Sequence, residues 1–170
     1  PPFPELTEKM EIAASMTAAK DVGGDFYDFF RIDDEHIGVI IADVSGKGIP
    51  AAIFMAVSRT LIRATALRGV SPSECLTYSN KLLEKESVNC MFVTVFYGIY
   101  NTTTGELVYT NAGHNPPYIV KPNGEVKEFP MATDPIVGIL GDYQYDEQTI
   151  HLEQDESLVL YTDGVTEAMN

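Results

Sequence analysis

The chain has 170 residues, a length typical of one domain, and a domain of this size can bury about 70% of the surface of its unfolded chain. Apolar residues make up 45% of the sequence and charged residues 21%, which excludes an intrinsically disordered or collagen-like chain. The 11 basic and 25 acidic residues give a net charge of -14, which disfavours nucleic acid and anionic membranes as partners, because both are bound through lysine and arginine. An acidic chain can still bind a phosphorylated substrate when metal ions supply the positive charge.

The two cysteines, Cys75 and Cys90, have neither the spacing of a zinc or redox site nor the density of a disulfide scaffold, so we expect a cytoplasmic location. No apolar run reaches the roughly 18 residues of a membrane span, and the first residues do not resemble a signal peptide. We expect residues 1–170 to form a single domain, truncated at its C-terminal end and excised from a larger regulatory protein. That larger protein could be anchored in a membrane through a region outside this sequence.

Taken in chain order, two strands are expected first, at residues 11–18 and 36–42. A helix follows from Pro50 to about residue 68, because Ile53, Val57 and Leu61 recur every four residues and Gly69 is a typical stop.

The second predicted helix runs from Ser71 to about Ser87, with a serine cap, Pro72 in the first turn and Glu74 near the positive end of the helix dipole. The remaining chain predicts strands at residues 92–100, 106–111, 118–121, 125–129, 148–152 and 157–161. Because the two helices are consecutive and most strands form hairpins, we expect an α+β fold of two packed, mainly antiparallel sheets flanked by helices.

Three aspartates have glycine within three positions in otherwise apolar segments: Asp25, Asp43 and Asp163. Asp43 and Asp163 each follow an apolar strand, where a carboxylate can be held rigidly, and glycine lets a ligand approach the backbone closely. Hard oxygen ligands suit Mg²⁺ or Mn²⁺, and no His/Cys cluster competes for the role. Any one of these aspartates near glycine could belong to an ordinary turn, but together they indicate a carboxylate metal site.

Five motifs also resemble a known family. They are residues 22–28 (VGGDFYD), 42–48 (ADVSGKG), 92–98 (FVTVFYG), 109–117 (YTNAGHNPP) and 160–167 (LYTDGVTE). Their order resembles the bacterial branch of PPM-type (protein phosphatase 2C-like) serine/threonine phosphatases, which includes the stage II sporulation protein E domain and phosphatase regulators of stress sigma factors. The resemblance spans nearly the whole chain.

The resemblance implies an α-β-β-α sandwich with two Mn²⁺ or Mg²⁺ ions at one end. Asp43 would bridge the ions, the backbone carbonyl of Val44 would complete one shell, Asp25 would lie on that side, and Asp163 would bind the other ion. A metal-activated water would then attack phosphorus in line. The resemblance implies a further aspartate ligand, beside Asp163, beyond Asn170.

Other residues in the motifs are weaker candidates for binding substrate or orienting the metal ligands. Lys47, beside Gly46, could contact phosphate, and Asp28 could orient a metal-bound water or be a turn residue. His114 could donate a proton to the leaving oxygen, or it could hydrogen-bond a tight turn with Asn111. Gly164 completes this group of candidates.

By resemblance, the substrate would be a phosphorylated anti-anti-sigma protein with a STAS domain, whose dephosphorylation releases a sigma factor by partner switching. An upstream sensor domain would control activity, and the two helices between Pro50 and Ser87 would couple a homodimer interface to metal binding.

Two alternatives stay open. A non-catalytic module could keep this fold and only bind a partner. Residues 23–26 (GGDF) also resemble the GGDEF signature of diguanylate cyclases, although that signature has an acidic residue where this chain has Phe26.

Overall fold

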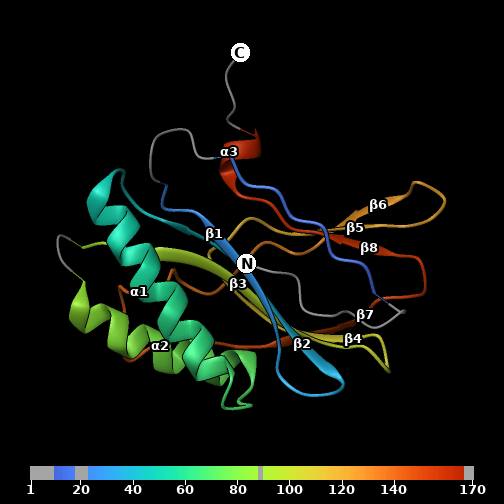
Figure 1. Ribbon diagram of the computed structural model, residues 1–170, viewed down its shortest axis with the longest axis horizontal. Coiled ribbons are helices and arrows are strands. Elements are labelled where there is room, and N and C mark those ends of the chain that lie inside the picture. Colours follow the sequence, from blue (N-terminus) through green and yellow to red (C-terminus); the bar gives the residue numbers. More distant parts are fainter. Residues whose placement is uncertain (1–9, 18–22, 88–89, 167–170) are drawn as a thin grey trace.

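The structure, a computed structural model, describes residues 10–17, 23–87 and 90–166 (Figure 1). Five strands form the larger sheet in the order β1-β2-β3-β4-β7, and three form the smaller sheet in the order β6-β5-β8, with every neighbouring pair antiparallel. The larger sheet contains β1 Phe26–Arg31, β2 His36–Val44, β3 Val93–Asn101, β4 Glu106–Ala112 and β7 Gln148–His151. The smaller sheet contains β5 Tyr118–Val120, β6 Val126–Glu128 and β8 Ser157–Val159.

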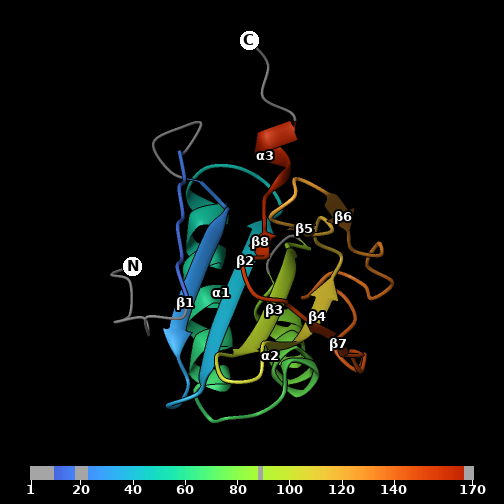
Figure 2. The same ribbon diagram turned by 90° about the vertical axis from the view of Figure 1, so that its right-hand side faces the viewer.

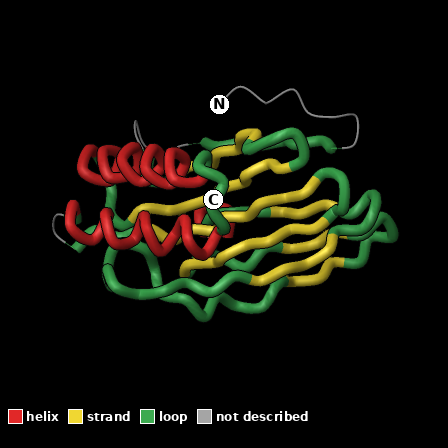
Figure 3. Tube along the Cα trace, turned by 90° about the horizontal axis from the view of Figure 1, so that it is seen from below, coloured by secondary structure: helices red, strands yellow, loops and turns green. Residues whose placement is uncertain are grey.

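Two long helices, α1 Ile49–Ala66 and α2 Pro72–Glu86, lie side by side against one face of the larger sheet (Figures 1 and 3). Figure 2 shows α1 behind β1 and β2. A third helix, α3 Asp163–Thr166, is a single turn.

Each face of the larger sheet has its own apolar core, because side chains alternate along a strand. On β3, Val95 and Tyr97 pack toward the helices, whereas Phe96 faces the smaller sheet and stacks on Tyr109. The smaller sheet contributes Ile119 to this second core. The larger sheet therefore lies between the helices and the smaller sheet, and the predicted α+β class is confirmed.

Both predicted helices are present, and their ends follow the signals in the sequence. Gly69 has a φ of 74°, the left-handed conformation that ends a helix, two residues after the C-cap of α1. At α2 the Ser71 side chain accepts from the backbone N–H of Glu74, and the Glu74 side chain accepts from that of Ser71. This reciprocal pair satisfies two helix-end donors, which explains why α2 begins where predicted.

The buried face of α1 is not the one that the sequence repeat suggested. Ile53 and Val57 are 61% and 42% exposed, whereas Phe54, Ser58 and Ile62 face the sheet. The four-residue spacing of Ile53, Val57 and Leu61 identified the helix. The residues that contact the sheet have the same spacing, but each is the next residue in the sequence.

Near the N-terminus one predicted strand is absent, and one strand that was not predicted is present. Residues 10–17 form no strand, although one was expected at 11–18; Ala18 itself lies outside the described residues. Instead β1 is the edge strand of the larger sheet, pairing Phe26 with Ala42. The sequence did not indicate β1 because the buried Asp28 interrupts its apolar residues.

Helix α1 is, among the described helices, the one long and apolar enough by length and composition to cross a membrane. Its packing is that of a helix covering a sheet: Phe54 and Ile62 belong to the core, and Arg59 and Arg63 form ion pairs with Asp28 on β1.

Candidate metal centre

Three of the sequence motifs meet at one end of the larger sheet. Asp43 is the penultimate residue of β2, and Asp25 immediately precedes β1, whose first residue pairs with Ala42. The chain after β8 reaches the same place, since the Thr162 hydroxyl donates to Asp25 Oδ2 at 2.7 Å. Asp163 follows as the first residue of α3. The fold thus brings the Asp163 segment, more than 100 residues later in the sequence, to Asp25 and Asp43.

The carboxyl group of Asp43 lies in a strongly acidic setting. Partial burial, a hydrogen bond with Asp25, and the negative charges of Asp25 and Asp163 together raise the pKa of Asp43 to about 7. Each of these disfavours the charged carboxylate. Near neutral pH the metal-free protein therefore retains a proton that an isolated aspartate would have lost, and a bound divalent cation would relieve this accumulation of negative charge.

The donor atoms fit a hard divalent cation, which prefers carboxylate and carbonyl oxygen. Within the described part of the chain, no three His, Cys, Asp or Glu side chains are close enough together to hold a metal ion in common. The carboxylates are therefore farther apart than those of a metal-bound site. Asp25 and Asp43 are the pair in hydrogen-bonding reach, and Asp163 acts on Asp43 through charge alone.

Gly24 allows the two strands carrying Asp25 and Asp43 to approach. A Cβ at position 24 would lie 2.8 Å from the carbonyl oxygen of Val44 and 3.2 Å from its Cβ, closer than a side chain tolerates. The Val44 carbonyl is therefore positioned against the backbone that leads into Asp25.

The loop after Val44 turns sharply into α1. Gly46 and Gly48 have φ values of 92° and 76°, which glycine adopts readily. Ser45 fixes the start of the loop: its N–H donates to the Phe92 carbonyl at 2.9 Å, and its hydroxyl accepts from the Phe92 N–H at 3.0 Å. Lys47 is exposed at the tip, and Gly164 is likewise exposed in α3.

His114 is almost fully buried, at 3% exposure, beside this end of the sheet. Its Nδ1 lies 2.8 Å from Thr94 Oγ1 and its Nε2 lies 3.1 Å from the Tyr161 carbonyl oxygen. The Asn111 side chain closes the turn by pairing with the backbone N–H and carbonyl of His114. Burial lowers the pKa of His114 to about 4, although the Tyr161 hydrogen bond and the charges of Asp25 and Asp163 act in the opposite direction. The imidazole is therefore neutral at physiological pH.

This burial predicts a pH-dependent contribution to stability. The unfolded chain protonates His114 below its ordinary pKa of 6.5, whereas the folded chain does so only below about 4, so the fold loses stability as the pH falls between these values. Relative to His114→Gln, the wild-type free energy of unfolding should fall by about 1–2 kcal/mol between pH 7 and pH 5. Urea unfolding of both proteins at the two pH values measures this difference. A difference that is the same at both would contradict it.

Asp28 lies away from the three carboxylates, between β1 and α1. Its side chain is fully buried and accepts from Arg63 Nη1 at 2.7 and 2.9 Å and from Arg59 Nε at 3.2 Å. The Arg63 guanidinium also lies 4.9 Å from the centre of the Phe30 ring. The structure thus brings Asp28 together with α1.

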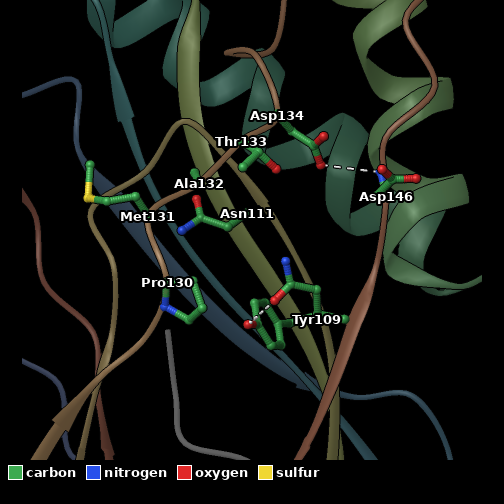
Figure 4. Close-up of a pocket in the computed structure, with 9 residues that line it drawn as sticks. Tyr109, Asn111, Pro130, Met131, Ala132, Thr133, Asp134 and Asp146 are labelled. Atoms are coloured by element: carbon green, nitrogen blue, oxygen red, sulfur yellow. Dashed lines mark hydrogen bonds between the residues drawn. The ribbon is translucent and has the colours of Figure 1, made fainter.

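A polar pocket is lined by residues of β4 and β7 and of the segment 130–134, and it contains none of the three aspartates (Figure 4). Within it, the Tyr109 hydroxyl donates to Gln148 at 2.7 Å, and the Asp146 N–H donates to Asp134 at 3.2 Å. Asn111 lines the same pocket, which places this predicted residue between the pocket and the His114 turn.

Sequence reasoning missed Thr94, Tyr161 and Thr162, although all three lie inside the recognised motifs. Two of them act through hydroxyl groups and Tyr161 acts through its backbone carbonyl. A hydroxyl residue beside a motif aspartate was the available signal for Thr162.

Comparison with known proteins gives a consistent family. The family model described as "Stage II sporulation protein E (SpoIIE)" matches residues 33–170. Phosphoserine phosphatase RsbU of Bacillus subtilis is 36% identical over 160 residues, which cover 94% of this chain and 48% of that protein. The chain therefore spans about half the length of this relative.

Two solved structures are similar in fold. The structure of the RsbU and RsbW domains of Rv1364c from Mycobacterium tuberculosis has a TM-score of 0.79 at 24% identity, covering 89% of this chain and 42% of that one. RsbX, crystallised in complex with magnesium, has a TM-score of 0.69 at 20% identity, covering 86% of this chain and 69% of that one. The family model covers most of the sequence, and the five motifs predicted the same assignment: the chain belongs to the stage II sporulation protein E (SpoIIE) family.

Proposed function

We propose that this domain is a metal-dependent protein phosphatase that hydrolyses phosphoserine or phosphothreonine with water activated by two Mn²⁺ or Mg²⁺ ions. The observation that carries the proposal is the meeting of Asp25, Asp43 and the Asp163 segment at one end of the larger sheet, where burial and the neighbouring carboxylates raise the pKa of Asp43 to about 7. The 36% identity to a protein named phosphoserine phosphatase supports the activity, and the magnesium complex of RsbX supports the cofactor.

In this proposal the carboxylates of Asp25, Asp43 and Asp163 and the carbonyl of Val44 would hold the ions. Bound ions would polarise the phosphoryl oxygens and lower the pKa of a water molecule. The chain itself orients the ligands: Thr162 holds one oxygen of Asp25, and the Ser45–Phe92 hydrogen bonds hold the turn that follows Val44. Lys47, exposed at the tip of this loop, would face the negative charge of the substrate.

The physiological setting is part of the same proposal. We infer a cytoplasmic domain, acting on a phosphorylated STAS-domain protein and controlled by a sensor domain elsewhere in a longer protein. A homodimer formed through the helical layer belongs to this proposal. The family relationship to RsbU supports the substrate class, and the free Cys75 and Cys90 are in keeping with a reducing compartment.

Phosphate release from a serine-phosphorylated STAS-domain protein tests the activity. We expect release with Mn²⁺, none with a chelator, and little from a phosphotyrosine peptide of similar charge. Release that persists in excess chelator would show that the reaction does not use the proposed ions.

The alternative is a binding module without turnover, and one observation favours it: the described carboxylates do not close around a single point. Such a module would bind the phosphorylated STAS-domain protein in pull-down or calorimetry without releasing phosphate at any Mn²⁺ concentration. The two functions are separated by measuring binding and release on the same sample.

A further inference from the structure

His114 connects three segments that are far apart in the sequence. Its own turn follows β4, its Nδ1 meets Thr94 on β3 at 2.8 Å, and its Nε2 meets the Tyr161 carbonyl after β8 at 3.1 Å. Both ring nitrogens are thus engaged within the protein.

The partners of the ring determine where its proton lies. A backbone carbonyl can only accept, so Nε2 must carry the hydrogen and donate it to Tyr161. Nδ1 is then unprotonated and accepts from the Thr94 hydroxyl. That hydroxyl has one proton, so its 3.5 Å approach to the Asp43 carbonyl is not a second donated bond.

The Tyr161 carbonyl is two residues before Asp163 and next to Thr162, whose hydroxyl binds Asp25. A hydrogen bond that fixes this carbonyl therefore fixes the segment that contains Asp163, and it also fixes Thr162, which orients the carboxylate of Asp25. The anchor is rigid, because His114 is 3% exposed and Asn111 holds its backbone on both sides.

We propose that His114 is a positioning residue, whose Nε2–H holds the Tyr161 carbonyl and thereby sets the place of Asp163 and Thr162 relative to Asp43 and Asp25. This inference rests on the proposed metal centre and adds a specific role within it. A residue in this role controls metal affinity, whereas a proton donor to the leaving group would control the rate of the chemical step.

Two amide substitutions separate the two ring nitrogens. Glutamine places its amide nitrogen the same number of bonds from Cβ as Nε2, so His114→Gln can still donate to Tyr161. Asparagine reaches only as far as Nδ1, so His114→Asn can accept from Thr94 but leaves the Tyr161 carbonyl without its donor. The pair changes one hydrogen bond at a time, with neutral polar side chains in both.

The test is Mn²⁺ binding to the 170-residue chain, measured by titration calorimetry beside thermal unfolding without metal. We expect His114→Asn to weaken Mn²⁺ binding by about 10–100-fold, the effect typical of residues that orient metal ligands, and His114→Gln to stay within about 3-fold of wild type. His151→Gln is the matched control, because His151 is exposed on β7, and it should bind Mn²⁺ as wild type does.

Thr94 provides an independent check if His114→Asn does not fold. Thr94→Val removes the hydroxyl that orients the ring and should weaken Mn²⁺ binding several-fold, whereas Thr94→Ser keeps the hydroxyl and should restore it.

Three results would overturn the inference. If His114→Asn, or Thr94→Val where the former does not fold, binds Mn²⁺ as wild type does, the positioning role is wrong and the metal centre stands. If both His114 variants lose phosphatase rate equally at unchanged Mn²⁺ affinity, His114 acts in the chemical step. If the wild-type chain itself does not bind Mn²⁺, the proposed centre fails, and this role fails with it.

Discussion

Asp43→Asn is expected to lower Mn²⁺-dependent phosphate release by at least about a thousandfold, because the metal ions contribute several kcal/mol of transition-state stabilisation and each 1.36 kcal/mol is a factor of ten. Asparagine keeps the size of the side chain but supplies one weaker oxygen ligand where the proposal needs a bridging carboxylate. Initial rates at saturating Mn²⁺ measure the effect.

The same variant, although less active, should be more stable than the wild type in the absence of metal. The pKa of Asp43 is raised from 3.8 to about 7, so the metal-free fold loses stability as the pH rises through this range and carries the full cost of the charge above it. Without metal at pH 8, Asp43→Asn should therefore unfold at a higher temperature than wild type. An inactive variant that is also more stable shows that activity was not lost through unfolding.

Asp142→Asn is the matched control, since Asp142 is exposed and loses the same charge. It should leave both the rate and the metal dependence unchanged. An Asp43→Asn protein that remains as active as this control would contradict the role given to Asp43.

The largest stability effect is expected at Arg63. Arg63→Met keeps an apolar stem but leaves Asp28, which is fully buried, with only the 3.2 Å contact to Arg59. Removing one partner of a buried ion pair leaves the other charge desolvated; because Arg63 is itself 38% exposed and Arg59 remains, we expect a loss of about 3 kcal/mol, the lower end of the range for such pairs. Denaturant unfolding of the variant and wild type measures this difference.

Arg31→Met provides the comparison, because Arg31 pairs with Asp34 at the surface, where the two side chains are 52% and 98% exposed. Such pairs contribute about 0–1 kcal/mol. The double variant Asp28→Leu with Arg63→Met should recover part of the lost stability, since no buried charge then lacks its partner. Equal losses for Arg63→Met and Arg31→Met would show that the buried cluster is not a main support of α1.

Local signals in the sequence were sufficient for the two long helices and for the β3–β4 and β5–β6 hairpins. Ser71, Pro72 and Glu74 indicated the start of α2, and Gly105, with a φ of 78°, turns β3 into β4 between the two predicted strands 92–100 and 106–111. These signals act within a few residues, so a single sequence contains them completely.

Tertiary contacts decided what the sequence did not show. Asp28 is a charged residue in a strand, and nothing local indicates that Arg59 and Arg63, more than 30 residues later, make its burial acceptable. Tertiary contacts also decide which face of α1 is buried. The sheet packs against Phe54 and Ile62 and leaves Ile53 exposed, and the spacing of apolar residues alone does not show this.

In the candidate site, too, the sequence indicated some features and not others. Its three aspartates were identifiable from glycine-flanked motifs at strand ends. The supporting bonds were not, because Thr162 to Asp25 and His114 to Tyr161 join segments 137 and 47 residues apart, and the latter ends on a backbone carbonyl that every residue type possesses.

We propose above that Asp25, Asp43 and Asp163 hold two metal ions. The most direct test is a crystal of this domain grown with Mn²⁺, with anomalous diffraction data collected near the manganese absorption edge. We expect two anomalous peaks about 3.5–4 Å apart, both within ligand distance of the Asp43 carboxylate, as in two-metal hydrolytic sites. A map with no peak at Asp43, from crystals that hold manganese elsewhere, would contradict the proposal.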